Sequence, residues 1–313
     1  AGFIGSHICD AIIYQGGNVI CLDNFLTGFR KNIEHLLGNK NFKLIEGDIR
    51  DIDTCRKAMK NCTHVCHQAA LGSVPRSVAD PLTSNDINIS GTLNIYFSAY
   101  EAGVKRIVFA SSSSCYGDEP ILPKVENKIG KPLSPYAITK VCDKLYASVF
   151  QELYQMEMIG LRYFNVFGPR QDPDGMYAAV IPRFVKSLIK QESPQIFGDG
   201  EQSRDFTYIE NVVQMNLKAL TTKSKEATGL NYNVACGKRI TVNQLFQTLR
   251  SNLTNMDSNI AKIEPEYVDP RPGDIPHSLA NIELAKNNLG YNPEIMPAKG
   301  ISKAINWYWE NLQ

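Results

Sequence analysis

The segment Ala1-Gly2-Phe3-Ile4-Gly5-Ser6-His7 opens a helical pattern and matches the second half of a glycine-rich dinucleotide-binding loop. In such a loop Gly2 lets the backbone approach a pyrophosphate, and Gly5 lets the helix pack close to a sheet. The apolar segment Asn18-Val19-Ile20-Cys21-Leu22-Asp23 follows and ends in an acid, at the spacing of a carboxylate that binds a ribose. Together the two segments predict a dinucleotide-binding α/β fold.

Asp23 distinguishes between the two nicotinamide cofactors. A carboxylate at this point accepts hydrogen bonds from both ribose hydroxyls and repels a 2′-phosphate, which favours NAD over NADP. A single acid at the end of a strand is more often a turn former, so this interpretation depends on the glycine loop beside it. We expect NAD as the cofactor.

The first glycine of the loop and the strand that should precede it are absent from this numbering. That strand is normally central and buried on both faces. Each buried Val or Ile side chain contributes roughly 1.5–3 kcal/mol, and a whole domain is stable by only about 5–15 kcal/mol. We therefore expect residues 1–313 alone to be poorly soluble and to retain NAD weakly.

Short apolar segments then alternate with helical patterns, which predicts a Rossmann-like, doubly wound parallel sheet. The expected strands are 18–23, 42–46, 63–68, 106–111 and 159–164, and the expected helices lie near 3–16, 51–60, 85–103 and 136–155.

Beyond Gly168 the pattern changes to longer loops, and a smaller C-terminal α/β substrate domain is expected to close over the strand ends. Its helices are expected at 180–190, 210–220, 242–253 and 281–289, before an amphipathic helix at the end of the chain. We expect an NAD-binding domain over 1–168 with 203–236 returning to it, and a substrate-binding domain over 169–202 and 237–313.

The segment Ser134-Pro135-Tyr136-Ala137-Ile138-Thr139-Lys140 indicates the chemistry. On a helix, Tyr136 and Lys140 leave the same face one turn apart. An ammonium beside a phenol lowers the tyrosine pKa from about 10, so the tyrosine can act as a general base. The chain has 14 tyrosines, so chance alone supplies such a spacing. The context strengthens it, because strand 106–110 delivers the serine run 111–114 at its carboxyl end, where parallel sheets bind ligands.

Charge and composition exclude several classes of partner. The 33 basic and 32 acidic residues nearly cancel, and no basic patch is visible, which argues against nucleic acid. No apolar run reaches membrane-spanning length. The eight cysteines are scattered, which is typical of reduced thiols in a cytoplasmic protein rather than of a disulfide framework.

One cluster of metal-ligating residue types lies at Cys62, His64, Cys66 and His67. It coincides with an expected strand, in which alternate side chains face opposite layers. These side chains cannot converge on one ion, and no second ligand set is present in the sequence. We expect no metal.

With these motifs in place, the chain resembles the extended short-chain dehydrogenases/reductases of the NAD-dependent epimerase/dehydratase family. Within that family it is most similar to bacterial UDP-N-acetylglucosamine 4-epimerases of surface-polysaccharide pathways. The resemblance covers nearly the whole chain, and segments 71–77 and 177–182 are the more specific to the N-acetylhexosamine branch. The other matching segments are 2–5, 23–28, 47–50, 67–70, 111–117, 136–140, 161–168, 198–200 and 204–206.

The resemblance implies Tyr136 as the base, Lys140 as its pKa partner and nicotinamide-ribose ligand, and Ser112 as the catalytic hydroxyl. It implies cofactor contacts from Gly2, Phe3, Ile4, Gly5, Asp23, Asn24, Gly28, Asp48, Ile49, Gln68, Ala69, Ala70, Tyr136 and Lys140. It implies substrate contacts from Ser73, Val74, Ser112, Ser113, Ser114, Tyr136, Asn165, Ala179, Val180, Arg204, Arg271 and Ser278.

Two of these groups carry a more specific expectation. Arg204 and Arg271 would neutralise the diphosphate of UDP through bidentate hydrogen bonds. The alternative for Arg204 is a structural ion pair, and the alternative for Arg271 is a surface charge without a ligand. Ser278 aligns with the residue that gates the 2-substituent of the sugar, where a serine leaves room for an acetamido group. An exposed loop serine without contacts is the alternative.

The implied reaction is a 4-epimerisation. Tyr136 takes the 4-hydroxyl proton while C4 gives hydride to NAD, the 4-keto sugar turns about its diphosphate, and hydride returns to the other face. Binding energy must then lie mostly on UDP. The sugar is an N-acetylhexosamine or its uronic acid, and a homodimer through helices 85–103 and 136–155 is expected.

Two other functions compete. A nucleotide-sugar 4,6-dehydratase or decarboxylase shares the Tyr/Lys pair but needs an acid beside the catalytic hydroxyl, where this chain has Ser113 and Ser114. A regulatory NAD-binding protein without activity typically lacks the tyrosine or the lysine, and both are present.

Overall fold

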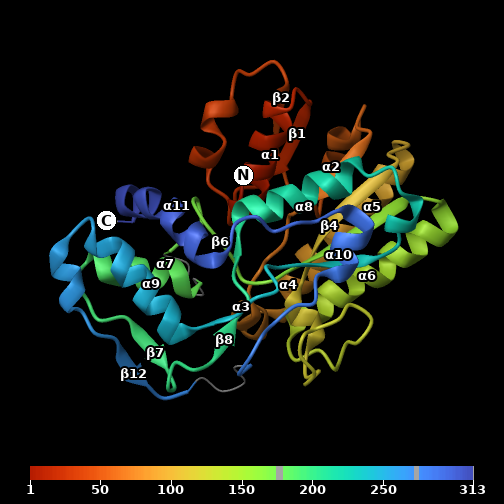
Figure 1. The fold of residues 1–313 in the computed structure, drawn as a ribbon. Helices are drawn as coiled ribbons and strands as arrows, with labels where there is room; N and C mark the ends of the chain where they lie inside the picture. Colours follow the sequence, from red (N-terminus) through yellow and green to blue (C-terminus); the bar gives the residue numbers. More distant parts are fainter. Residues whose placement is uncertain (174–178, 271–274, 313) are drawn as a thin grey trace.

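The computed structural model describes residues 1–173, 179–270 and 275–312 (Figure 1). Arg271, which the resemblance assigned to the diphosphate, lies outside the described residues.

A parallel sheet of four strands forms the centre of the molecule, in the order β10-β5-β4-β3. Its strands are β3 (His64–His67), β4 (Arg106–Ser112), β5 (Glu157–Tyr163) and β10 (Asn231–Val234). Both faces are buried, because successive side chains of β4 enter different cores. Val108 packs in one hydrophobic cluster, whereas Ile107 and Phe109 pack in another.

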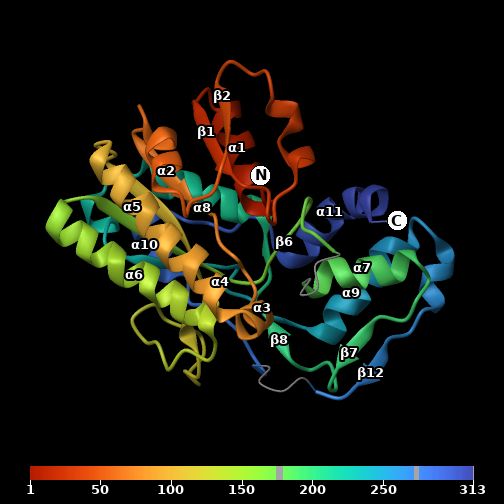
Figure 2. The same cartoon turned by 180° about the vertical axis from the view of Figure 1, so that it is seen from behind.

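Helices cover the two faces of this sheet, as expected for a doubly wound fold. One face is covered by α5 (Thr92–Glu101) and α6 (Pro135–Tyr154), and the other by α8 (Ile209–Thr221). Figure 2 shows α5 and α6 side by side, with α8 behind them. The Rossmann-like α/β class is confirmed.

The two N-terminal strands form a sheet of their own. β1 (Val19–Asp23) pairs in parallel with β2 (Phe42–Glu46). The sequence analysis expected a single sheet, but β1 and β3 are not hydrogen-bonded neighbours among the described strands. Helices connect the two sheets instead, because α1 (Phe3–Tyr14) contacts β1 and α8, and α2 (Ile52–Met59) contacts β1 and α5.

The helix expected near 85–103 differs in detail. It begins earlier, as α4 (Pro81–Asn85), continues through a π-helical turn at Asp86–Gly91, and ends as α5. The short α3 (Val74–Ala79), which was not expected as a helix, precedes it. Pro75 and Pro81 in the first turns suit helix starts, since a proline lacks only a donor that would be unpaired there.

Three further helices lie on the opposite side of the molecule from α5 and α6 (Figures 1 and 2): α7 (Val180–Ile189), α9 (Val242–Thr254) and α11 (Pro297–Asn311). Helix α10 (Glu283–Leu289) lies instead beside the central sheet, where it contacts β10 and α8. Short strand pairs join them: β6 (Val166–Phe167) with β9 (Thr207–Tyr208), β7 (Gln195–Phe197) with β12 (Glu266–Val268), and β8 (Ser203–Arg204) with β11 (Ile240–Thr241). The division into two domains stays a prediction.

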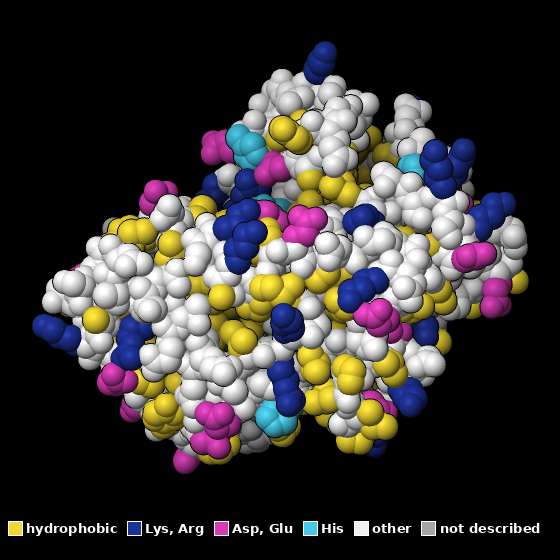
Figure 3. Space-filling view, in the orientation of Figure 1, with side chains coloured by type: hydrophobic (Ala, Val, Ile, Leu, Met, Phe, Trp, Pro, Cys, Tyr) yellow, Lys and Arg dark blue, Asp and Glu magenta, His cyan; other side chains and the backbone are white. Residues whose placement is uncertain are grey.

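Several single-turn 3-10 helices complete the described chain: Arg30–Asn32, Glu34–Leu36, Ser113–Tyr116, Lys225–Ala227 and Ser258–Lys262. Basic and acidic side chains are interspersed on the face shown in Figure 3. No helix in the described part of the chain combines the length and apolarity that crossing a membrane requires. All eight cysteines are described, and none forms a disulfide.

Candidate active site

The start of α6 places Tyr136 at the carboxyl end of β4. Ser134 caps the helix by accepting a hydrogen bond from the Ala137 nitrogen at 3.1 Å, and Pro135 occupies the first turn. Ser112, the last residue of β4, is close enough to Tyr136 for its hydroxyl to lower the pKa of the phenol. The strand and the helix therefore bring together the serine and the tyrosine that the sequence predicted.

Lys140 lies one turn after Tyr136 and is 2% exposed. Its ammonium lowers the pKa of Tyr136, as expected, and so does the Ser112 hydroxyl. Burial is the largest effect, however, and it raises the pKa of Tyr136 above its usual value of about 10. The net direction is therefore opposite to the one expected from the sequence, because withdrawal from water outweighs one nearby cation.

Asp143 is a partner of Lys140 that the sequence analysis missed. Its Oδ2 lies 2.9 Å from the Lys140 Nζ, and both side chains are almost fully buried. The spacing of three residues on a helix was the available signal, but a sequence does not tell a buried pair from an exposed one.

The loop after β3 lies beside the Tyr136 hydroxyl. A β-carbon built on Gly72 would be 4.0 Å from that oxygen. Ser73 caps α3 by accepting from the Arg76 nitrogen at 3.2 Å, and Val74 is exposed. The predicted substrate residues Ser73 and Val74 are thus next to the candidate base.

Two buried side chains, both missed from the sequence, hold this loop in place. Ser77 accepts a hydrogen bond from the backbone nitrogen of Tyr136 at 3.0 Å. Asn88 accepts from the Leu71 nitrogen at 2.8 Å and donates to Thr139 at 3.2 Å. The loop is therefore tied to the same turn of α6 that carries Tyr136.

Ser113 and Ser114 follow β4 in a 3-10 turn and are half-buried. The Ser114 hydroxyl donates to the Ser112 oxygen at 3.0 Å, and the Ser114 nitrogen is 3.1 Å from the same atom. The Ser112 oxygen is therefore well supplied with donors, so its own proton is directed to another acceptor.

The glycine loop fits a dinucleotide. Gly2 caps α1 in an extended conformation, and no atom lies within 4 Å of a β-carbon built on it, so its backbone is accessible at a helix N-terminus. Gly28 is different, because its β-carbon would lie 2.9 Å from the Ala1 carbonyl carbon. Asp23 ends β1 with one oxygen 2.8 Å from the Ala1 amino nitrogen, so the loop and the predicted ribose carboxylate are neighbours.

Other predicted cofactor residues surround this loop. Phe3 and Ile4 form the half-buried first turn of α1, and a β-carbon on Gly5 would lie 4.0 Å from the β-carbon of Gln68. Gln68 receives a hydrogen bond from Tyr163 at 3.0 Å. Ala69 is exposed and Ala70 half-buried at the carboxyl end of β3.

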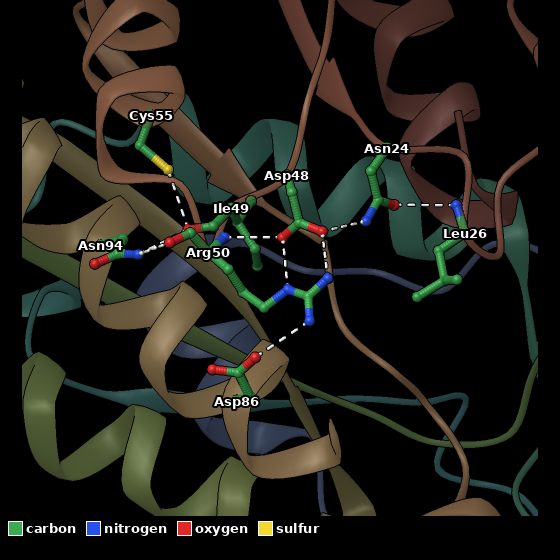
Figure 4. A network of polar contacts seen from close by, with 8 residues as sticks. All are labelled: Asn24, Leu26, Asp48, Ile49, Arg50, Cys55, Asp86 and Asn94. Atoms are coloured by element: carbon green, nitrogen blue, oxygen red, sulfur yellow. Dashed lines mark hydrogen bonds and ion pairs between the residues drawn. The ribbon is translucent and has the colours of Figure 1, made fainter. Parts of the chain in front are cut away.

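A polar network lies just after β1 and β2, around Asp48 (Figure 4). Arg50 donates to both oxygens of Asp48, at 3.0 and 2.8 Å, and the Asn24 amide donates to one of them at 2.8 Å. These bonds, those of Arg50 above all, hold the pKa of Asp48 well below its usual range. Asp86 accepts from Arg50 at 3.2 Å, and Ile49 is buried beneath the network.

A cavity lies between α7, β7 and β8. It is lined by Asn165, Val180 and Arg204, three of the predicted substrate residues. It is also lined by Arg183, Phe197 and Gln202, which the sequence analysis missed because no motif singled them out.

Two other predicted substrate residues are close to this cavity but do not line it. Ala179 is exposed just before α7. Ser278 is half-buried, and its nitrogen donates to the Ser203 carbonyl at 2.9 Å, beside Arg204. The gate at Ser278 stays a prediction.

Among the described residues, no group of three or more His, Cys, Asp or Glu side chains is placed to hold a metal ion.

A family model described as NAD dependent epimerase/dehydratase matches residues 1–235. The chain belongs to this family. The chain is 33% identical to the UDP-glucose 4-epimerase of Mycolicibacterium smegmatis, over 100% of this chain and 97% of that protein. It is 31% identical to the UDP-glucuronate 4-epimerase of Thermodesulfobacterium geofontis, over 100% of this chain and 95% of that protein.

A solved structure gives a third comparison. It is the UDP-N-acetylglucosamine 4-epimerase from Methanobrevibacter ruminantium M1 in complex with UDP-N-acetylmuramic acid. The TM-score is 0.90 and the identity 39%, with 99% of this chain and 96% of that chain covered. This chain is accordingly an isomerase of the UDP-sugar 4-epimerase group, with NAD as its cofactor.

Proposed function

We propose that this chain is an NAD-dependent 4-epimerase of a UDP-N-acetylhexosamine, acting through a transient 4-keto sugar. One observation carries the proposal: the Tyr136 phenol has the Ser112 hydroxyl and the Lys140 ammonium as neighbours, and both lower its pKa. This group stands at the carboxyl end of β4, beside the Gly72 loop. A tyrosine in that position is suited to handling the proton of a secondary alcohol.

The role of Tyr136 is proton transfer with the 4-hydroxyl. Ser112 orients that hydroxyl, and the Lys140 ammonium stabilises the phenolate. NAD, when bound by the glycine loop and Asp23, supplies the acceptor and donor of hydride at C4. Burial raises the pKa of Tyr136, and Lys140 and Ser112 oppose that rise by favouring the charged phenol.

The cavity between α7, β7 and β8 suits the UDP part of the substrate. Arg183 and Arg204 bring two cations to it, and Gln202 and Asn165 bring amides. Charge-assisted hydrogen bonds to a diphosphate are among the strong ones. Binding through UDP would leave the sugar free to turn between the two hydride transfers.

The dehydratase and decarboxylase alternatives require an acid beside the catalytic hydroxyl. Ser113 and Ser114 occupy that place, and the Ser114 hydroxyl donates its hydrogen bond to Ser112. This arrangement supports an epimerase over an elimination reaction.

An N-acetylhexosamine is favoured over a plain hexose by Ser278, a small residue whose backbone nitrogen bonds the strand that carries Arg204. The resemblance of segment 71–77 to the N-acetylhexosamine branch points the same way. We also propose that the enzyme acts in polysaccharide biosynthesis.

We also infer a homodimer, with a second copy of this chain on the outer face of α5 and α6. That face exposes several large hydrophobic side chains: Phe97, Tyr100, Leu145, Tyr146, Val149 and Leu153. Leu153 alone is 71% exposed, and a monomer rarely leaves so continuous an apolar face in water. Sedimentation should show a dimer that Leu145→Glu with Leu153→Glu dissociates; a wild-type monomer would contradict the inference.

Product analysis on a panel of UDP-sugars tests the proposed function. The protein is incubated with UDP-N-acetylglucosamine, UDP-glucose and UDP-glucuronate without any added reductant. We expect conversion of UDP-N-acetylglucosamine to its 4-epimer as the most efficient reaction. A 4-keto-6-deoxy sugar, a decarboxylated product or no conversion of any sugar would refute it.

A further inference from the structure

The pair formed by Lys140 and Asp143 is unusual in its burial. Their side chains are 3% and 2% exposed, and Nζ lies 2.9 Å from Oδ2. A charged carboxylate in such a place is costly unless it is paired and hydrogen-bonded. Asp143 therefore has a fixed position next to the ammonium that the proposed reaction uses.

Thr92 is a further neighbour of the carboxylate. Its hydroxyl oxygen lies 2.9 Å from the His67 Nε2, and the same hydroxyl lowers the pKa of Asp143. Burial is the largest effect on the pKa of Asp143 and raises it, and Lys140 and Thr92 oppose that effect. Thr92, His67 and Asp143 are all buried.

The titratable groups that face Lys140 and Asp143 come from four elements. Tyr136 lies on the same helix, Cys115 on the turn after β4, His67 on β3 and Tyr96 on α5. Burial lowers the pKa of His67 to about 3 and raises that of Tyr96 well above 10, so both are neutral near pH 7. The charge near Tyr136 is therefore governed by Lys140 and Asp143 together.

We propose that Asp143 is a positioning residue: it holds the Lys140 ammonium and, through its own charge, sets the pH at which Tyr136 can accept the substrate proton. This inference rests on the proposed epimerase function. A negative charge so close to Lys140 cancels part of the field that the ammonium exerts on the phenol.

The sign of the effect follows from charge alone. Without the negative charge of Asp143, the first proton leaves the Tyr136–Lys140 pair more easily, whichever of the two groups loses it. The pH midpoint of activity should therefore move downward in a neutral variant. A residue that only packs would leave the midpoint where it is.

The experiment compares kcat against pH for the wild type and Asp143→Asn, which keeps the shape and one acceptor oxygen while removing the charge. We expect the midpoint to fall by about 1 pH unit, with KM for the UDP-sugar nearly unchanged. Asp143→Glu, which restores the charge, should return the midpoint toward that of the wild type.

The control is Glu157→Gln, which removes a carboxylate from the ion pair with buried Arg106, at the opposite end of the sheet strands. It should leave the midpoint in place. If Asp143→Asn does not fold, Asp143→Ser makes the same charge change with a smaller side chain.

If a folded neutral variant has the same midpoint of the kcat–pH profile as the wild type, the inference is overturned. Failure of both neutral variants to fold would also overturn it, because Asp143 would then be a structural residue. Absence of epimerisation by the wild type is a separate outcome, which refutes the proposed function itself.

Discussion

The backbone nitrogen of Tyr136 donates a hydrogen bond to the Ser77 hydroxyl at 3.0 Å, and Ser77 is fully buried. The Ser77 hydroxyl in turn donates to the Val74 carbonyl at 2.7 Å. One side chain therefore connects the loop that flanks the candidate base to the first turn of α6, so the positions of substrate loop and base depend on each other.

Replacing Ser77 by alanine tests this connection. We expect Ser77→Ala to lower the free energy of unfolding by about 1 kcal/mol and kcat by roughly tenfold, because misplacing a base by a fraction of an ångström is costly. Thermal melts and steady-state kinetics measure the two effects.

Ser84→Ala is the matched control, since Ser84 is equally buried and its hydroxyl donates to the Asp80 carbonyl at 2.9 Å. It should lose similar stability and keep its kcat. Equal losses of kcat in both variants would mean that Ser77 has no special connection to Tyr136.

Removing the Tyr136 hydroxyl should abolish most of the turnover. Tyr136→Phe keeps the ring that packs between the loops, so NAD and UDP binding should be nearly intact, as calorimetry can check. We expect turnover to fall by about 10²–10⁴-fold, the usual size of a general acid–base contribution. Tyr232→Phe, at a buried tyrosine that donates to the Ala227 carbonyl, should keep wild-type turnover. Turnover of Tyr136→Phe within a few-fold of wild type would remove it from the base role.

Lys140 provides a prediction about pH. Its ammonium lowers the pKa of Tyr136, so removing it raises that pKa, and the phenolate forms only at higher pH. We expect Lys140→Met to be slower and to shift the rise of kcat upward by about 1–3 pH units. Lys190→Met, at the exposed end of α7, is the control. A profile for Lys140→Met that coincides with the wild type would show that the ammonium does not tune the base.

The fold was largely predictable from sequence because its signals are local. The glycine loop, the strand ending in Asp23 and the Tyr136–Lys140 spacing are each contained in a few residues, and the structure places them on α1, β1 and α6 as expected. Strand β10 was expected only as part of a returning segment, because four residues carry too little pattern to identify a strand.

The rest of the site depends on contacts between distant segments. Arg183 shares a cavity with Arg204 only because α7 packs beside β8, and no spacing in the sequence shows this. The direction of the Tyr136 pKa shift was missed for a similar reason. It results from burial by several elements, which outweighs the one charge that the sequence identified.

The choice of sugar depends on Ser278. We expect Ser278→Tyr to lower kcat/KM for UDP-N-acetylglucosamine by about tenfold or more and to spare UDP-glucose, because only the larger substrate meets the ring. Ser278→Ala, which removes only the hydroxyl, should affect both sugars little. Equal losses on both sugars in the tyrosine variant, or no change on either, would place the gate elsewhere.

The central claim is that one hydride leaves C4 and returns to C4 of the same sugar. The most direct test uses UDP-N-acetylglucosamine deuterated at C4, incubated with the protein in ordinary water without added reductant, with the product examined by NMR. The proposed reaction predicts a 4-epimer that keeps its deuterium at C4. A product that carries the deuterium at C6, or an epimer that has exchanged it for solvent hydrogen, would contradict the account.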